Sequence, residues 1–300
     1  GLEVLIAIAR FWAQRVNWSE DKQQYVMLGV TGPNEYENNV NNNWYTNKLA
    51  TWTLGYSLEL LGKFEGSEKL NSLLSRVNFH KEEPQKWQDI IDNMYYPYDE
   101  ARGVFLQQDG FLDKELIPTA ELDKSQRPIH QNWSWDRILR SCYIKQADTL
   151  QGIYLFEDEF DLGTIERNFD FYEPITVHES SLSPCVHMIL ASKIGRKEKA
   201  YEMYLRTARL DLDDYNNDTE DGCHTTSMGG TWMAYAKGIA GMRVKNGELH
   251  FSPFLPDQWE GYSFSIKFRE CYLTIHVNQS EVTISNEAEG HLELFIHEQP

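Results

Sequence analysis

One stretch near the start of the chain concentrates groups that bind sugars. Residues 32–47 hold two carboxylates, seven asparagines and three aromatic rings. Asparagine weakens helices because its amide competes for nearby backbone groups, so local structure gives no reason for this composition. Fixed amides and carboxylates beside aromatic rings suit a hydroxyl-rich ligand, and cleavage of a glycosidic bond needs a carboxylic acid beside the leaving oxygen. The stretch therefore predicts a sugar site with Glu35 as the candidate acid.

The same stretch also fits the start of a helix. Asn38 or Asn39 would cap it, and the apolar spacing predicts a helix from about residue 41 to residue 61. The free N–H groups at the start of this helix would point back at the loop that carries Glu35. The two interpretations are compatible.

A second run, Lys145-Gln146-Ala147-Asp148, combines a cation with an amide that both donates and accepts hydrogen bonds. Such a pair suits the hydroxyl groups of a sugar. The run also fits the start of a helix that is capped by side chains. Residue types alone leave both interpretations open.

Two hydroxyl-rich stretches predict an anion site. Ser180 and Ser181 precede an apolar run that predicts a helix ending near Lys193, and the N–H groups at a helix start attract anions. The same serines are also ordinary N-cap residues. His224 stands among small and hydroxyl residues ahead of another predicted helix, where the backbone can approach a ligand closely. A lone histidine is, however, more often a satisfied structural residue.

Taken in order, these stretches resemble the motifs of glycoside hydrolase family 65, a family of glycoside phosphorylases. The resemblance covers Gly-Pro-Asn-Glu-Tyr-Glu at 32–37, Lys-Gln-Ala-Asp at 145–148, Tyr-Glu-Pro at 172–174, the serine pair, and His-Thr-Thr-Ser-Met-Gly-Gly-Thr-Trp at 224–232. Asn34 and Glu37 depart from the commoner Gly-Pro-Asp-Glu-Tyr-His and favour the branch that acts on maltose.

The resemblance implies a role for each matched residue. Glu35 corresponds to the general acid of the family. Lys145 and Gln146 correspond to substrate contacts, and Glu173 to a residue that faces the sugar in the acceptor subsite. The residues assigned to phosphate binding are Ser180, Ser181, His224 and Thr225.

The implied reaction is inverting phosphorolysis of an α-linked glucose disaccharide, with maltose as the favoured substrate, to β-glucose 1-phosphate and glucose. We expect Glu35 to stay protonated through partial burial among Trp44 and Tyr36 and to protonate the glycosidic oxygen. Inorganic phosphate is then the co-substrate, and we expect no metal, nucleotide or flavin cofactor.

Two other functions remain open from the sequence. An inverting hydrolase of the same fold would use Glu179 or Glu173 as the base that activates water. A carbohydrate-binding or structural piece would have no turnover. Linkage preference among maltose, kojibiose, nigerose and trehalose is not readable from these residues.

The elements that must position these residues are mainly helices. Paired helical patterns without β-α-β alternation predict an all-α domain. The expected helices cover about residues 2–15, 41–61, 67–77, 84–93, 132–142, a segment ending near 193, 197–210 and 232–241. After residue 243 the pattern alternates with period two, which predicts a small antiparallel β-domain over 244–300.

The resemblance places these helices in an (α/α)6 barrel. That barrel needs twelve helices and the sequence shows eight to ten, so residues 1–243 are expected to form its C-terminal part, incomplete in this chain. The first residues read as a helix already under way, so we expect the natural chain to continue upstream. The 300 residues alone are expected to be inactive.

Composition excludes several partners. A net charge of −18 argues against nucleic acid or an anionic membrane as a partner. Apolar runs fall far short of the roughly 20 residues needed to cross a bilayer, and no secretory signal is present, which favours the cytoplasm. The four cysteines are widely spaced, which favours free thiols over a zinc site or disulfides. The oligomeric state is not readable from the sequence; members of the family that the chain resembles are often dimers, so the resemblance leaves a homodimer open.

Overall fold

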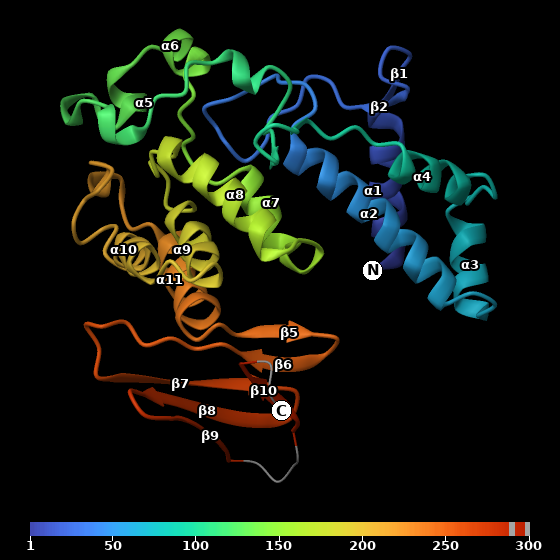
Figure 1. The fold of residues 1–300 in the computed structure, drawn as a ribbon. Coiled ribbons are helices and arrows are strands. Elements are labelled where there is room, and N and C mark those ends of the chain that lie inside the picture. Colours follow the sequence, from blue (N-terminus) through green and yellow to red (C-terminus); the bar gives the residue numbers. More distant parts are fainter. Residues whose placement is uncertain (288–291, 298–300) are drawn as a thin grey trace. The chain divides into compact units, whose positions relative to one another are not determined.

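The computed structural model describes residues 1–287 and 292–297 of the chain. The chain falls into two compact units, residues 1–177 and residues 178–300 (Figure 1). The predicted domain boundary at residue 243 stays a prediction.

Unit 1, residues 1–177, is mainly helical. Its helices are α1 (Leu2–Arg15), α2 (Trp44–Lys63), α3 (Glu68–Arg76), α4 (Glu83–Asp92), α5 (Ile129–Asn132), α6 (Trp135–Arg140), α7 (Thr149–Leu155) and α8 (Leu162–Tyr172), and η5 (Glu173–Ile175) is a short 3-10 helix near its end. Its two antiparallel hairpins pair β1 (Asn17–Ser19) with β2 (Gln24–Val26), and β3 (Tyr98–Asp99) with β4 (Val104–Phe105).

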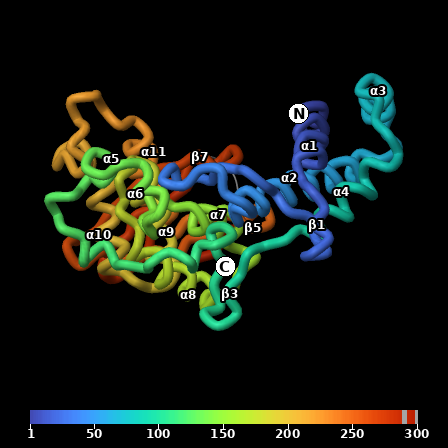
Figure 2. Tube along the Cα trace, turned by 90° about the horizontal axis from the view of Figure 1, so that it is seen from above, coloured from blue at the N-terminus to red at the C-terminus, as the bar shows by residue number. Residues whose placement is uncertain are grey.

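A core cluster of unit 1 lies between α1, α2 and α4, which lie side by side in both views (Figure 1, Figure 2). Ile6 and Ala9 of α1 are buried there against Leu54 of α2 and Trp87 of α4. The apolar spacing of α1 that predicts a helix over 2–15 is therefore the spacing of its buried face. The prediction for α1 is confirmed at both ends.

The N-terminus of α2 differs from the prediction. Asn43 caps the helix, because its side-chain oxygen accepts a hydrogen bond from the Thr46 N–H at 2.9 Å. The predicted caps, Asn38 and Asn39, lie in the loop before it, where Asn39 adopts a φ of 54°. The helix therefore begins about three residues later than its apolar spacing predicts.

Helix α7 crosses α2 at a close contact. An ideal Cβ on Gly152 of α7 would lie 2.6 Å from the indole ring of Trp44, the first residue of α2. Only glycine fits at this distance. The Trp44 ring also stacks on Phe105 with a centroid separation of 4.8 Å, so it lies in the core.

Two further predictions of helices in unit 1 need correction. The helix predicted over residues 132–142 is shorter, because α6 covers only 135–140 and begins after its cap Ser134, and α5, which ends at residue 132, was not predicted. Helix α8 was not predicted. Its N-cap, Asp161, accepts a hydrogen bond from the Thr164 N–H at 2.8 Å.

Unit 2 begins with helices. α9 (Pro184–Lys193) is buried around most of its circumference, as expected for a helix that is apolar on all sides, and α10 (Lys197–Ala208) packs against it. α11 (Thr225–Met233) continues without a break into the π-helix η7 (Ala234–Ile239). The predicted helix over 232–241 is thus the end of α11 and the π-helical turn that follows it.

The strands of unit 2 follow the predicted change of period. In residues 178–287 and 292–297 they form one sheet in the order β7–β8–β9 and another in the order β10–β6–β5. The strands are β5 (Arg243–Lys245), β6 (Glu248–Phe251), β7 (Gly261–Phe268), β8 (Cys271–Asn278), β9 (Val282–Asn286) and β10 (Leu294–Ile296). Their pairings are antiparallel except that β10 runs parallel to β6, which the sequence did not predict.

The predicted fold class is confirmed in its main division, a mainly helical part followed by a small sheet region. Among the described residues, no helix combines the length and the apolar character that crossing a bilayer demands. Cys142, Cys185, Cys223 and Cys271 are free thiols, and Cys223 alone of these four is exposed.

Candidate functional site

Glu35 lies in a loop that docks on the run 145–148. The Asn34 N–H donates to Asp148 Oδ2 at 3.0 Å, and Gln146 Nε2 donates to the Pro33 carbonyl at 2.7 Å. The Lys145 N–H in turn donates to Asn34 Oδ1 at 2.9 Å. The two motifs that the sequence analysis singled out separately are therefore one hydrogen-bonded structure.

The carboxylate of Glu35 forms an ion pair with Lys145 Nζ. Its side chain is 55% exposed, whereas that of Lys145 is 22% exposed. The expected burial of Glu35 among Trp44 and Tyr36 is wrong, because Trp44 lies in the core and the Glu35 carboxylate reaches toward solvent and a cation. In the structure, the neighbour of the candidate acid is therefore a cation and not a set of apolar rings.

Asp148 lies beneath this loop and is 2% exposed. Its Oδ1 accepts a hydrogen bond from Asn43 Nδ2 at 2.9 Å, and its Oδ2 accepts the one from the Asn34 N–H. Burial raises the pKa of Asp148 to about 6, while the two hydrogen bonds act in the opposite direction. The carboxylate thus connects the start of α2, through its cap Asn43, to the residue that precedes Glu35.

Gly32 makes room for this carboxylate. An ideal Cβ on Gly32 would lie 2.4 Å from both Asn43 Nδ2 and Asp148 Oδ2. Any side chain there would push the loop away from Asp148. The glycine of the Gly-Pro-Asn-Glu motif is therefore required by close packing.

The many asparagines of the stretch 32–47 are explained largely by backbone conformation and by hydrogen bonds to backbone groups of the same unit, contrary to the expectation from composition. Asn39 and Asn42 adopt positive φ angles of 54° and 56°, which asparagine tolerates better than most residues. The side chains that bond to backbone groups are those of Asn34, Asn41, Asn42, Asn43 and Asn47. These amides build the loop, and Glu35 is the exposed carboxylate that the loop presents.

Glu173 is placed at the first residue of η5, directly after α8, where it is half-buried. Its assignment to an acceptor subsite stays a prediction. So do the substrate roles of Lys145 and Gln146, although both lie beside Glu35.

In unit 2, the structure brings Ser181 of the serine pair next to the start of α11. Ser181 Oγ and Thr226 Oγ1 are 2.7 Å apart, within hydrogen-bond distance. Helix α9 begins at Pro184, so Ser180 and Ser181 lie in the turn before it and do not cap it. The Ser181 hydroxyl group and the first turn of α11 are therefore neighbours within unit 2. The assignment of these groups to phosphate binding stays a prediction.

His224 precedes Thr225, the first residue of α11, and its imidazole lies between two carboxylates. Nδ1 is 2.6 Å from Asp211 Oδ1, and Nε2 is 3.4 Å from Asp218 Oδ2. The hydrogen bond with Asp211 is the largest cause that raises the pKa of His224. The positive charge of a protonated His224 is therefore already balanced by the acidic loop.

Sequence reasoning missed three functional candidates. Asp148 is the last residue of the Lys-Gln-Ala-Asp motif, but the sequence predicted no role for it. Its contacts with residues 34 and 43 join segments that are distant in the sequence. Asp211 and Asp218 were seen only as members of a polar acidic loop. The concentration of aspartates at 211–221 just ahead of His224 was the available signal.

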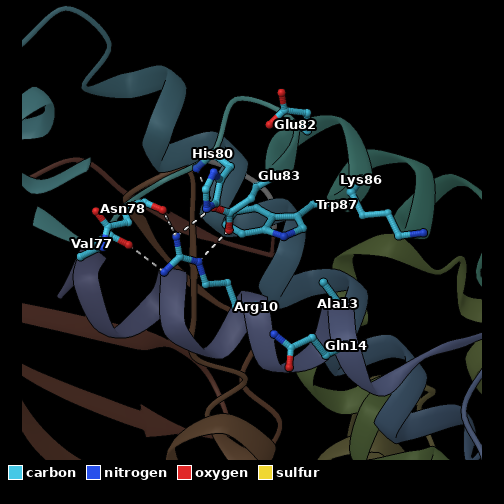
Figure 3. A pocket seen from close by; sticks show the side chains of 10 residues that line it. All are labelled: Arg10, Ala13, Gln14, Val77, Asn78, His80, Glu82, Glu83, Lys86 and Trp87. Carbon is cyan, nitrogen blue, oxygen red and sulfur yellow. Dashed lines mark hydrogen bonds and ion pairs between the residues drawn. The ribbon is translucent and has the colours of Figure 1, made fainter. Parts of the chain in front are cut away.

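A cavity of about 620 Å³ lies elsewhere in unit 1, between α1 and α4 (Figure 3). Arg10 projects into it and forms two hydrogen bonds with the Glu83 carboxylate, at 2.7 and 2.8 Å. The same guanidinium donates to the carbonyl oxygens of Val77 and Asn78 at 3.0 and 3.1 Å. Since protein atoms already bond to the guanidinium, we assign this cavity to the packing of α1 against α4 and not to a ligand site.

Comparison with known proteins gives two domain matches. Residues 1–233 match the sequence profile described as "Glycosyl hydrolase family 65 central catalytic domain". Residues 242–300 match the profile described as "Glycosyl hydrolase family 65, C-terminal domain".

Individual relatives agree with these matches. The chain is 52% identical over its whole length to a maltose phosphorylase of Bacillus subtilis, of which it covers 39%. It is 39% identical to an alpha,alpha-trehalose phosphorylase of Thermoanaerobacter brockii, with 95% of the chain and 37% of the relative covered. It is 32% identical to a kojibiose phosphorylase of Halothermothrix orenii, with the same two coverages.

A solved structure extends the comparison to the fold. The chain superposes on a putative kojibiose phosphorylase from the human microbiome with a TM-score of 0.92 and 35% sequence identity, covering all of this chain and 41% of the other. The fold class, part of an (α/α)6 barrel followed by a small C-terminal β-domain, is confirmed. The chain spans about two fifths of the length of the relatives it matches.

Proposed function

The chain belongs to glycoside hydrolase family 65, and from this premise we propose that its whole protein is an inverting disaccharide phosphorylase in which Glu35 is the general acid. The observation that carries the proposal is the docking of the Glu35 loop on residues 145–148. This contact holds one exposed carboxylate beside a cation and an amide, which are the groups a sugar-binding acid site needs.

The proposed substrates are maltose and inorganic phosphate, without a metal or an organic cofactor. Maltose is favoured because the B. subtilis maltose phosphorylase is more similar to the chain than the trehalose and kojibiose phosphorylases named above. Glu35 gives its proton to the glycosidic oxygen while that oxygen leaves the anomeric carbon. A phosphate oxygen forms the new bond from the opposite face, which yields β-glucose 1-phosphate and glucose, and a proton from phosphate returns to Glu35 through solvent.

Lys145 must change partner during this reaction. In the structure it pairs with the Glu35 carboxylate, the group that has to donate a proton to the glycosidic oxygen. A sugar hydroxyl that accepts a hydrogen bond from Lys145 would separate the pair. Substrate entry would then free the Glu35 carboxyl from the ion pair, so that it can face the leaving oxygen.

The proposed phosphate donors are the Ser180 and Ser181 hydroxyl groups, His224 and Thr225 at the start of α11. A helix N-terminus and neutral hydroxyl groups can bind an anion even in a chain with a net charge of −18. Fixed local donors act at contact distance, whereas distant surface charges are screened by salt.

The test uses the full-length protein with maltose, kojibiose, nigerose and trehalose, each with and without phosphate. We expect phosphate-dependent release of glucose and β-glucose 1-phosphate, with the anomer identified by NMR and with maltose as the best substrate. Release of glucose that does not depend on phosphate would instead show the hydrolase alternative.

The acid is tested by Glu35→Gln in the same protein. Because general acid catalysis typically supplies 10²–10⁴-fold, we expect a rate loss of that order with unchanged folding. Glu100→Gln, at an exposed carboxylate in a turn of the same unit, is the matched control and should keep its rate. A loss below about tenfold for Glu35→Gln would remove Glu35 as the acid.

A further inference from the structure

We propose that Asp148 is the positioning residue of Glu35: its buried carboxylate holds the loop 32–36 so that the acid meets the leaving oxygen. This inference rests on the proposed function, in which Glu35 is the general acid. It assigns Asp148 no contact with the substrate.

The placement of Asp148 is costly for the fold and therefore needs a reason. A carboxylate removed from water loses hydration, and hydrogen bonds restore only part of it. Asp148 stands at the N-cap position of α7, yet within the described part of the chain its side chain makes no capping hydrogen bond to that helix. Its two oxygens accept from Asn34 and Asn43, in segments more than 100 positions away.

The contact made with Asn34 fixes the backbone on both sides of the acid. While the Asn34 N–H is held by Asp148, the side-chain oxygen of Asn34 accepts from the N–H groups of Lys145 and Tyr36 at 2.9 and 3.2 Å. Residues 34 and 36 are thus both tied, and Glu35 lies between them. Gly32 permits this arrangement because a residue without a Cβ leaves space for the Asp148 carboxylate.

The Asp148 side chain has to be a carboxylate because each of its two oxygens accepts a hydrogen bond. An amide in its place would present an N–H group to one of the two donors, the Asn34 N–H or Asn43 Nδ2. The loop would then shift by a fraction of an ångström to about one ångström, and a displacement of that size in a catalytic group costs on the order of 10²-fold in rate.

The test separates positioning of the acid from general damage by changing the leaving group. Maltose needs a proton on its leaving oxygen, whereas α-glucosyl fluoride releases fluoride with little help from an acid. In the full-length protein with phosphate, we expect Asp148→Asn to lower kcat on maltose by about 10²-fold and kcat on α-glucosyl fluoride by less than about fivefold. Glu35→Gln should show the same pattern.

The control is Asp89→Asn, on α4. Asp89 also accepts a hydrogen bond from a buried group, the Tyr25 hydroxyl at 2.5 Å, but it lies away from the Glu35 loop. We expect this variant to treat the two substrates alike. Circular dichroism and melting temperatures are compared for all variants.

Equal losses on both substrates for Asp148→Asn, or an unchanged rate on maltose, would overturn the inference. If Asp148→Asn does not fold, Gly32→Ala displaces the same carboxylate without changing its charge and must show the same difference between substrates. A wild-type protein without phosphate-dependent turnover, or a Glu35→Gln variant that keeps its rate on maltose, would instead refute the proposed function, so the two failures are distinguishable.

Discussion

The side-chain oxygen of Asn34 accepts a hydrogen bond from the N–H of Lys145 at 2.9 Å, across 111 positions of sequence. This bond sets the residue before Glu35 directly against the residue that forms an ion pair with Glu35. The positions of Glu35 and Lys145 therefore depend on one hydrogen bond between a side chain and a backbone N–H, and changes on either side of it should affect both.

Lys145→Met should lower kcat/KM for maltose by roughly 10- to 100-fold in the full-length protein. The variant loses a hydrogen bond from a charged group to the sugar, which is worth roughly 1.5–3 kcal/mol. Steady-state kinetics measure the effect. Lys48→Met removes another ion pair of the same unit, with Glu159, and should leave kcat/KM unchanged. An unchanged KM and kcat in Lys145→Met would exclude Lys145 as a sugar contact.

The stability of the protein should depend on the ionisation of Asp148 between about pH 4 and pH 6. Because burial raises its pKa from 3.8 to about 6, the group favours the folded state most at low pH, where it is protonated in both states. As the pH rises, the unfolded chain ionises first, and this contribution, roughly 3 kcal/mol, is lost. Tyr45 and Tyr172, the titratable groups that interact with Asp148, stay neutral in this range, since both have a raised pKa.

This pH dependence is measured as the difference in melting temperature between wild type and Asp148→Asn. The melting temperature of the wild type should fall relative to that of the variant as the pH rises from 4 to 6. A difference that stays constant over this range would contradict the prediction.

Asp218→Asn should lower the KM for phosphate about two- to fivefold. Its carboxylate lies 3.4 Å from His224 Nε2 and competes with an incoming anion for that group. Asp213→Asn is the matched control, because Asp213 belongs to the same acidic segment but pairs with Arg209. A higher KM in Asp218→Asn would mean that Asp218 orients the imidazole and does not compete with phosphate.

Arg10→Met should destabilise the packing of α1 on α4 by roughly 1–3 kcal/mol, because the Glu83 carboxylate and the carbonyl oxygens of Val77 and Asn78 lose the hydrogen bonds that Arg10 donates. Arg10 also holds the pKa of Glu83 below 4.5, so this stabilisation is present above that pH and is lost as the pH falls further. Melting temperatures measure the effect. Arg76→Met breaks an exposed pair with Glu3 and should change little. Equal shifts for both variants would contradict a special role of the half-buried Arg10–Glu83 pair.

The elements that the sequence predicted well are those whose patterns are local. Helix α1 follows from an apolar stripe that ends before Asn17, and α3 follows from the cap Ser67, which accepts from the Leu70 N–H. The break between α5 and α6 was missed because the aromatic residues at 133 and 135 continue an apolar pattern that the cap Ser134 interrupts.

The candidate site was only partly predictable. Glu35 and Lys145 could be named from their motifs, but their ion pair depends on a contact between distant segments. The asparagine-rich composition was assigned to sugar binding, whereas the amides of residues 34, 41, 42, 43 and 47 mainly support the backbone. Such satisfied backbone groups become visible only when the partner strands and loops are in place.

The contact between Trp44 and Gly152 couples the register of α2 and α7 to the placement of the Glu35 loop. A slip of α7 along α2 by one turn, about 5.4 Å, would drive a side chain into the indole ring. The residues just ahead of the two helices, Asn43 and Asp148, can then meet in a single alignment. A substitution that shrinks the ring at position 44 would allow larger residues at position 152, and it would relax the alignment that keeps the acid loop in place.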